Sequence, residues 1–259
     1  MKYGNVINSV NVSTNGNVSI VQSFVCSGDT VENNVRVERK SAFDARIEDV
    51  VEQITNDDLR TRFNALVQHV IDRFGAMRTA NFLSYLHENG FFDAPASTRW
   101  HLAYSGGLLE HSVNVAEQMI KLAVNYGGAS VESCAVIGLF HDVCKMDAYV
   151  YDDVTDKFKW NKNRLADVTN DSEHGELSVK RISAFLPLSD AEKAAIEWHM
   201  GLYDWRLNPP RNAGDMTSED ILDNIKAMHK RYEDTCNQYS TVKLAHIADM
   251  IASQLVEKD

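Results

Sequence analysis

The stretch that decides the fold is residues 135–142, AVIGLFHD, an apolar run that ends in a histidine and an aspartate. Gly127-Gly128 break the chain before it, and Ser130 is placed to cap a helix there. We therefore predict a buried helix with His141 and Asp142 at its edge. Because neighbouring residues on a helix point about 100° apart, both can reach one ion only at a helix end or through a bridging carboxylate.

Amphipathic helical patterns continue on both sides of this run. Upstream, Asn56 is a candidate cap and Gly75 a candidate stop. Downstream, Ser189 and Glu192 form a capping box after Pro187. Helices are expected from 56 to 75, from 79 to 88, from about 108, from 130 to 141, from 189 through Trp198 and His199 to Gly201, and near 218–233 and 241–256. Residues 91–107 and 149–171 are predicted to be loops.

Residues 1–40 have a different texture, rich in Asn, Val, Ser and Gly, with short alternations such as Val10-Asn11-Val12. They predict one or two β-hairpins or a partly disordered arm. A marginal hairpin tends to find a sheet partner, so the arm could mediate homo-oligomerisation. The predicted fold is mainly α, with a helical domain over 41–259 and a β-like appendage over 1–40.

The bulk composition narrows the function classes. In 259 residues no apolar run approaches the ~18 residues that a membrane span needs, and the N-terminus lacks a secretory pattern, which favours a cytoplasmic protein. Four cysteines without a CxxC pair indicate neither a zinc knuckle nor a disulfide framework. With 37 acidic and 26 basic residues, the net charge of −11 disfavours long nucleic-acid substrates, although a local basic patch could be hidden in the average.

Two further residues stand where a metal ligand would be expected. His111 follows the glycines at 106 and 107 and lies one turn inside an apolar helix pattern. Asp249 has apolar neighbours, and an ionised carboxylate there would be costly to bury without a partner such as a metal ion. A single histidine on an apolar helix, however, is more often a hydrogen-bonded core residue.

Three segments together carry a resemblance to a known family: residues 107–112 (GLLEHS), 139–145 (LFHDVCK) and 248–249 (AD). They resemble the H…HD…D signature of the HD-domain metal-dependent phosphohydrolase superfamily, over roughly Arg99 to Ala252. The chain is similar to small HD proteins of phages and gut bacteria, which would place a phage-encoded protein in the host cytoplasm. More distantly, residues 101–111 (HLAYSGGLLEH) resemble bacterial HD-domain 3′→5′ exoribonucleases.

The resemblance implies a helical bundle that binds one or two divalent cations, with Mn, Fe, Ni, Mg and Zn all compatible with mixed imidazole and carboxylate ligands. The implied metal ligands are His111, His141, Asp142 and Asp249, extended by His174 and His199 for a second ion. His174 and His199 could instead contact a phosphate or cap a helix. We predict that Asp142 bridges two ions, that a metal-activated water attacks phosphorus, and that Lys145 stabilises charge on the phosphoryl oxygens.

Arg99, His101 and Tyr104 precede the first ligand and could bind a phosphate or stack on a base. The leading function is cleavage of a phosphate ester or anhydride in a nucleotide or short oligonucleotide. The alternatives are 3′→5′ exonuclease action on single-stranded RNA or DNA and a non-catalytic scaffold that binds a nucleotide or a protein. Substrate selectivity is expected in the loops at 149–171 and 203–217, whose sequences do not identify the substrate.

Overall fold

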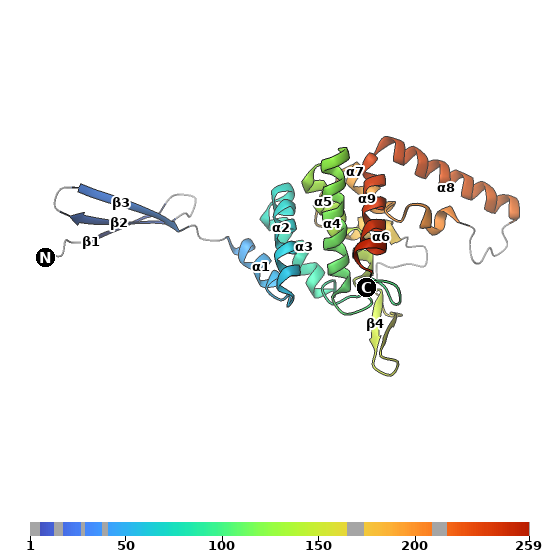
Figure 1. Ribbon diagram of the computed structural model, residues 1–259, viewed down its shortest axis with the longest axis horizontal. Helices are drawn as coiled ribbons and strands as arrows, with labels where there is room; N and C mark the ends of the chain where they lie inside the picture. The colour runs from blue at the N-terminus through green and yellow to red at the C-terminus, as the bar shows by residue number, and fades with distance from the viewer. Residues whose placement is uncertain are drawn as a thin grey trace. The chain divides into compact units, whose positions relative to one another are not determined.

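The computed structural model describes residues 41–164, 174–208 and 217–258, together with the backbone of three strands between residues 6 and 37 (Figure 1). Its contacts divide the chain into two units, Met1–Ala45 and Arg46–Asp259, so the boundary falls within the first helix, α1 (Ala42–Val51), which is described with the second unit. The first unit holds the strands β1 (Val6–Val12), β2 (Val18–Cys26) and β3 (Asp29–Val37) in an antiparallel sheet. Ile20 of β2 pairs with Val10 and Val35 on either side. These are two successive hairpins in the region where hairpins were predicted; oligomerisation through them stays a prediction.

The second unit is mainly helical, which confirms the predicted fold class. In order, its elements are α1 (Ala42–Val51), α2 (Asp57–Phe74), α3 (Ala76–Glu88), α4 (Gly107–Tyr126), α5 (Val131–Phe140), the 3-10 turn η1 (Val143–Lys145), β4 (Tyr149–Asp152), β5 (Lys157–Trp160), α6 (His174–Ser183), α7 (Asp190–Glu197), the 3-10 turns η2 (Gly201–Tyr203) and η3 (Trp205–Leu207), α8 (Ser218–Gln238), α9 (Ser240–Ile251) and the π-helical turn η4 (Ala252–Val256). None of the helices in the described part of the chain is both long and apolar enough to cross a bilayer.

Helix α5 lies at the centre of this unit because it is apolar on every side and almost wholly buried. It packs against α2, α4, α7 and α9. In Figure 1, α4 (green) and α9 (red) run side by side, as their contacts also show. Gly138 permits the close approach of α4 and α5, since a Cβ there would lie only 2.2 Å from the Ala116 Cα.

The caps that were predicted from the sequence are present. The Asn56 side chain accepts the Leu59 N–H at 3.0 Å, and Gly75 follows the last residue of α2. Ser189 and Glu192 form the reciprocal capping box at the start of α7. The helix ends therefore follow from local hydrogen bonding that short sequence patterns encode.

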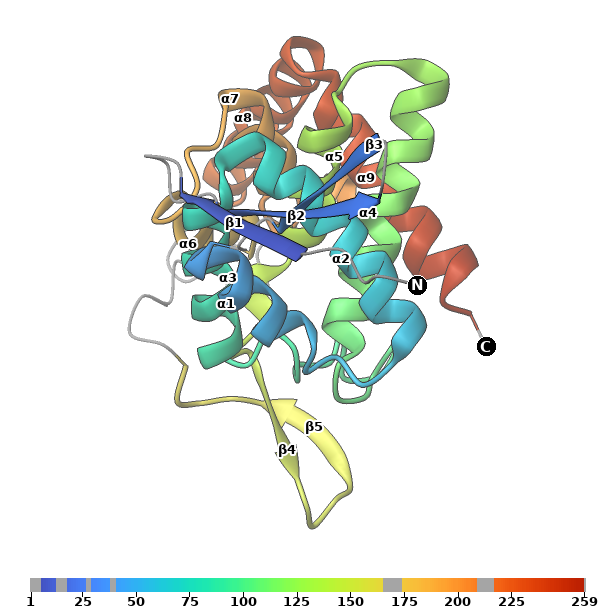
Figure 2. The same cartoon turned by 90° about the vertical axis from the view of Figure 1, so that its left-hand side faces the viewer.

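Two predictions about local structure are wrong. The expected helix through Trp198 and His199 ends at Glu197, and His199 lies in the following turn. The expected loop at 149–171 contains the β4–β5 hairpin, which projects away from the helices in Figure 2; residues 165–171 lie outside the described part. The helix expected near 241–256 is confirmed, with α geometry up to Ile251 and π geometry over Ala252–Val256.

Candidate metal centre

The end of α5 allows the adjacent residues His141 and Asp142 to face the same site. The helix stops at Phe140, His141 keeps helical dihedral angles, and Asp142 departs from them with φ −105° and ψ 19°. The 3-10 turn that follows carries Lys145, and residues three apart on such a turn are eclipsed. Asp142 and Lys145 therefore project together, and the Lys145 Nζ lies 2.6 Å from the Asp142 Oδ2.

Two histidine rings are held in the same way, by their own backbone. The Nδ1–H of His141 donates to the Gly138 carbonyl at 2.8 Å, and that of His199 donates to the Ile196 carbonyl at 2.7 Å. Since a carbonyl only accepts, the Nε2 atoms are the unprotonated ones in the neutral rings, free to bind a cation. Among the described residues the buried His141 Nε2 has no hydrogen-bond partner, which is what a metal ligand would look like without its ion.

Asp142 is the hub of the cluster, with a side chain only 2% exposed. Its Oδ2 faces His141 and His111, whose Nε2 atoms lie at 3.4 and 3.8 Å. Its Oδ1 faces His174 and His199, whose Nε2 atoms lie at 2.5 and 3.5 Å. The two carboxylate oxygens thus point at two different pairs of imidazoles, an arrangement suited to a bridging ligand.

The charges around this carboxylate determine its protonation. Burial alone would raise the pKa of Asp142, but the Lys145 ammonium and the histidines His141 and His174 hold that pKa well below its ordinary value. Burial likewise opposes charge on Lys145, yet Asp142 raises the pKa of the ammonium. The cluster therefore contains an ionised carboxylate and a charged lysine at neutral pH.

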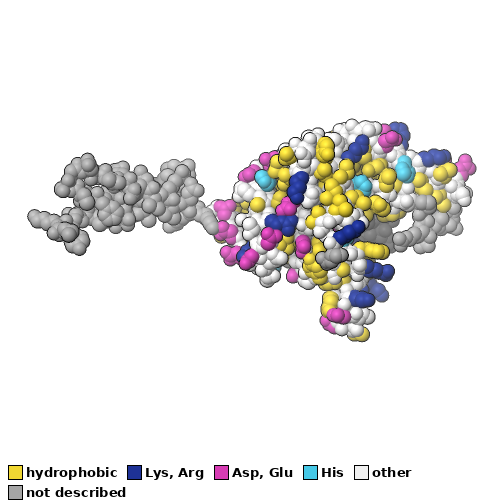
Figure 3. Space-filling model, viewed as in Figure 1, with side chains coloured by type: hydrophobic (Ala, Val, Ile, Leu, Met, Phe, Trp, Pro, Cys, Tyr) yellow, Lys and Arg dark blue, Asp and Glu magenta, His cyan; other side chains and the backbone are white. Residues whose placement is uncertain are grey.

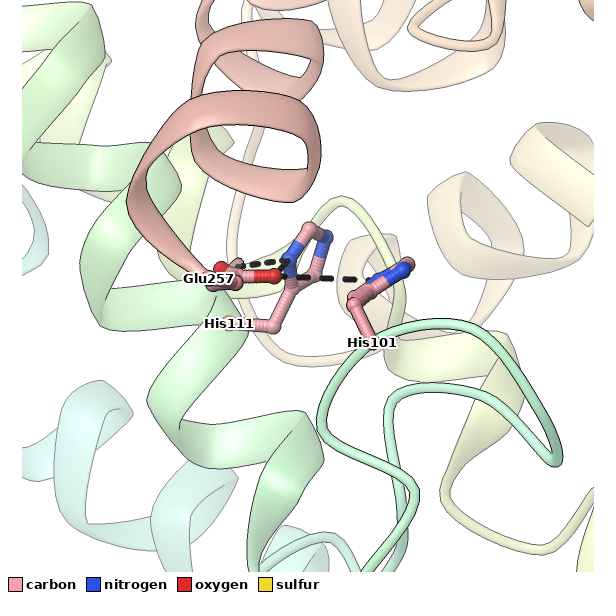
Figure 4. A group of neighbouring side chains, drawn as sticks. All are labelled: His101, His111 and Glu257. Carbon is pink, nitrogen blue, oxygen red and sulfur yellow. Dashed lines mark hydrogen bonds and ion pairs between the residues drawn. The ribbon is translucent and has the colours of Figure 1, made fainter. Parts of the chain in front are cut away.

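His111 is held by carboxylates on both sides of its ring. Its Nε2 lies 3.3 Å from the Asp249 Oδ1, and its Nδ1 lies 3.0 Å from the Glu257 Oε1 (Figure 4). Burial lowers the pKa of His111, but these two carboxylates outweigh it and raise the pKa to about 9. The pKa of Asp249 shifts in the opposite direction. Burial raises this pKa, but His111 outweighs burial and holds it below the ordinary value.

Glu257 is a site residue that the sequence did not indicate. It follows the π-helical turn at the end of α9 and accepts a second hydrogen bond from the Asn114 Nδ2 at 3.0 Å. Asn114 in turn accepts from the Arg62 Nη2 at 2.7 Å, so a chain of polar contacts fixes the His111 ring. A carboxylate behind a ligand imidazole selects its tautomer and orients it. No motif surrounds Glu257, so nothing in the sequence could have pointed to it.

Four groups of side chains in the described part of the chain could hold a metal ion, each with donor atoms within 4.8 Å of one another. They are His111–His141–Asp249, His141–Asp142–His199, Asp142–Cys144–His174 and His101–His111–Glu257. All six predicted ligands occur in the first three, so the structure brings them together, while their binding of an ion stays a prediction. Because His141 and Asp142 each belong to two of these groups, the groups are compatible with one ion or with two adjacent ions.

Cys144 and His174 add a feature that was not expected. The Cys144 thiol is buried beside Asp142 and His174, where no cysteine ligand was predicted from the sequence. Burial lowers the pKa of His174, but Cys144 and Asp142 outweigh it and raise the pKa to about 10. Cys144 is thus a neighbour of the cluster and not only a filler of the core.

The three predicted substrate contacts fall in two places. Arg99 and Tyr104 line a groove beside the β4–β5 hairpin. His101 instead turns towards Glu257, with its Nε2 3.9 Å from the Oε2 and its ring 4.9 Å from that of His111 (Figure 4). Burial, followed by the neighbouring His111, lowers the pKa of His101. Their contact with a substrate stays a prediction for all three.

The family model of the HD domain matches residues 108–253, more than half of the chain. This protein belongs to the HD domain family. The match confirms the resemblance inferred from the three short segments, and its span contains all six predicted ligands. The matched span does not include Glu257 or the three predicted substrate contacts, Arg99, His101 and Tyr104. No curated protein and no solved structure matches the chain significantly.

Proposed function

We propose that this HD protein is a metal-dependent phosphohydrolase that cleaves a phosphate ester or anhydride in a nucleotide or short oligonucleotide. The observation that carries the proposal is the placement of Asp142, whose two oxygens face two separate pairs of histidine Nε2 atoms. A divalent ion held there would lower the pKa of a bound water and neutralise phosphate charge. The matched family and the buried His/Asp groups support this class of reaction.

The donor set fits a divalent cation. Asp142, with a side chain 2% exposed, and Asp249, with a side chain 17% exposed, supply two negative charges, and the imidazoles supply neutral nitrogen ligands once deprotonated. In the absence of a cation, Lys145 and protonated histidines compensate these charges. A substrate phosphate adds further negative charge, which the same site would tolerate only with a cation present.

Lys145 is the chain's own positive charge at this centre. Its side chain is 14% exposed and its Nζ is at hydrogen-bond distance from Asp142, so it lies within reach of a phosphate that approaches the cluster. Positive charge at that position stabilises the phosphoryl oxygens most when charge accumulates on them, as it does in the transition state. We assign this electrostatic role to Lys145, and Asp142 would hold the divalent ion or ions.

The test is hydrolysis by the full chain of a panel of mononucleotides, cyclic nucleotides and short oligonucleotides, with Mn²⁺ or Mg²⁺ added after chelation. Wild-type turnover should require the metal, and Asp142→Asn should abolish turnover and lower the bound metal measured by mass spectrometry. Asp223→Asn is the matched control, because Asp223 is an exposed aspartate whose partner is Lys226 on α8. Full activity of the chelated protein or of Asp142→Asn would refute the proposal.

Stepwise cleavage of single-stranded RNA or DNA is the second candidate function. The specific observation in its favour is the groove beside the β4–β5 hairpin, which combines aromatic and basic side chains. Time courses with end-labelled oligonucleotides separate the two candidates. Stepwise shortening favours the exonuclease, and turnover of mononucleotides alone favours the first.

A further inference from the structure

The β4–β5 hairpin has two chemically different faces. Tyr149 pairs with Trp160 and Tyr151 pairs with Phe158 in the antiparallel register, so these four rings share one face. The rings of each pair are in contact, with centroids 6.0 and 5.3 Å apart. Trp160 is nevertheless 57% exposed and Tyr151 49% exposed. An aromatic face this open on a short hairpin is not needed for the helical core.

This aromatic face forms one wall of a groove, which we call the hairpin groove. The opposite wall comes from the loop that precedes α4 and includes Arg99 and Tyr104. The groove has a volume of about 1580 Å³, larger than the roughly 300–1,000 Å³ of typical small-molecule pockets. Its size suits a ligand longer than a single nucleotide.

The charges of the hairpin differ between its two halves. Residues 157–164 read KFKWNKNR, with four basic residues and no acid, whereas residues 149–156 carry Asp152, Asp153 and Asp156. In Figure 3, Lys and Arg side chains gather on one side of the projecting hairpin. Successive residues of a strand point to opposite faces, so Lys157 and Lys159 lie on the face opposite the four rings. The cations on the aromatic side are Arg164, whose guanidinium lies over the Trp160 ring at 5.0 Å, and Arg99 on the opposite wall, while Asp93 and Asp156 are the acids that line the groove. Arginine beside exposed aromatic rings is a combination that binds nucleobases and phosphates together.

The root of the hairpin is attached to the segment that carries Asp142 and Lys145. The Ala148 N–H donates to the Lys145 carbonyl at 3.0 Å, and the Asn161 N–H donates to the Ala148 carbonyl at 2.9 Å. Arg164 also pairs with Asp147 at 3.2 Å. Tyr149, the first groove residue of β4, is only four residues after Lys145. The hairpin wall of the groove is therefore hydrogen-bonded to the segment that carries the candidate metal centre.

We propose that the hairpin groove binds single-stranded nucleic acid and presents one of its phosphates to the metal centre, an inference that rests on the proposed function. Unpaired bases stack on Tyr151 and Trp160, and the phosphates contact Arg99 on the opposite wall and Arg164 beside Trp160. A duplex is excluded because its bases are already stacked on one another. A protein partner is disfavoured because lysine is depleted from the cores of protein interfaces, whereas Lys157 and Lys159 are also among the residues that line the groove.

The test is fluorescence anisotropy of the metal-free full chain with labelled single strands of about 12 nucleotides, RNA and DNA in separate arms, and with a duplex. Trp160→Ala and Tyr151→Ala should each weaken binding about 5- to 150-fold. Trp205→Ala is the matched control, since Trp205 is 58% exposed and lies outside the hairpin groove. It should change the affinity by less than about twofold.

The salt dependence of binding supplies a second readout that loss of stacking would not imitate. Arg99→Ala should reduce the slope of log affinity against log salt by about 0.7, the value for one phosphate contact on a single strand. Arg78→Ala is the matched control, because Arg78 is likewise exposed and lies outside the hairpin groove. Arg78→Ala should leave the slope unchanged.

Failure of this inference can be told apart from failure of the proposed function. Wild-type hydrolysis of bis(p-nitrophenyl) phosphate with Mn²⁺ tests the metal centre without the groove. Hydrolysis of that ester with no binding of any single strand overturns the groove assignment and leaves the phosphohydrolase standing. Equal loss of binding in Trp160→Ala and Trp205→Ala, or preferential binding of the duplex, also overturns it. Binding that depends on Trp160 and Arg99 supports it even if no phosphate ester is cleaved.

Discussion

Removal of the Glu257 carboxylate should weaken metal binding although Glu257 need not touch the ion. In Glu257→Ala, the His111 Nδ1–H loses acceptors at 3.0 and 3.1 Å, and the Asn114 Nδ2 loses one at 3.0 Å. Both donors belong to buried residues, so each costs about 1–3 kcal/mol of unfolding free energy if left unpaired. Loss of the carboxylate that orients a ligand histidine typically weakens metal binding about 10- to 100-fold.

The expected effect depends on pH in a defined direction. Burial lowers the pKa of His111, but Asp249 and Glu257 together raise it to about 9, so a metal must displace a proton from this ring at neutral pH. Removal of Glu257 lowers the pKa of His111, so protons compete less with the metal for this ring. This gain in metal affinity partly offsets the affinity that is lost when the ring is no longer oriented. The affinity loss should therefore be larger at about pH 8.5 than at about pH 7.

The assay is calorimetric titration of the chelated protein with Mn²⁺ at both pH values, with thermal unfolding as the check on folding. Glu257→Gln keeps one acceptor and should show an intermediate loss. Glu192→Gln is the matched control, because Glu192 is also 1% exposed and hydrogen-bonded, but to Ser133 of α5 and to Ser189, the N-cap of α7. A folded Glu257→Ala whose metal affinity at about pH 8.5 is within about twofold of wild type would refute the reasoning.

Three further outcomes are expected. Lys145→Ala should lower kcat about 100-fold, because it removes a positive charge that stabilises the transition state, and it should retain the bound metal. Steady-state kinetics and metal analysis measure these two quantities, and an unchanged kcat would contradict the role of Lys145. In chelated protein, the His111 pKa is raised from 6.5 to about 9, so its contribution to stability, about 3 kcal/mol, is complete below pH 6.5 and lost as the pH rises through 9. Denaturant unfolding across that range measures this loss, and stability that increases instead would oppose it. Gly138→Ala should lower the free energy of unfolding by about 1–3 kcal/mol, because the added Cβ would lie 2.2 Å from the Ala116 Cα. Thermal unfolding measures this loss, and a midpoint temperature equal to that of the wild type would show that α4 and α5 can separate freely.

The helices and their caps could be predicted because their causes are local. Asn56 and Ser189 cap helices through bonds to residues three positions away, and such spacings are visible in any sequence. The turn of His199 could not be predicted in the same way. Its helix ends at Glu197, and the ring is then held by the Ile196 carbonyl and packed against the other site histidines.

The hairpin at 149–160 shows that a polar segment of sequence need not be irregular in structure. Residues 149–171 were predicted to be a loop because the segment is polar and irregular. In the structure residues 149–160 alternate in the two-sided pattern of a hairpin, whose root is attached by Asn161 and Arg164 to the segment after α5. A short two-stranded hairpin is marginal alone, so these attachments stabilise what the local pattern left ambiguous.

What the sequence by itself determined is the set of chemical groups and the helices that carry them: His111 in a helix, His141 and Asp142 at the end of an apolar one, and Asp249 among apolar neighbours. These depend on short-range spacing and on the cost of burying charge. What only the tertiary structure decided is the direction of each donor atom and the contribution of Glu257, 146 residues from His111 along the chain. The physical reason is that packing of distant helices sets these distances, and no local pattern records which partners will meet.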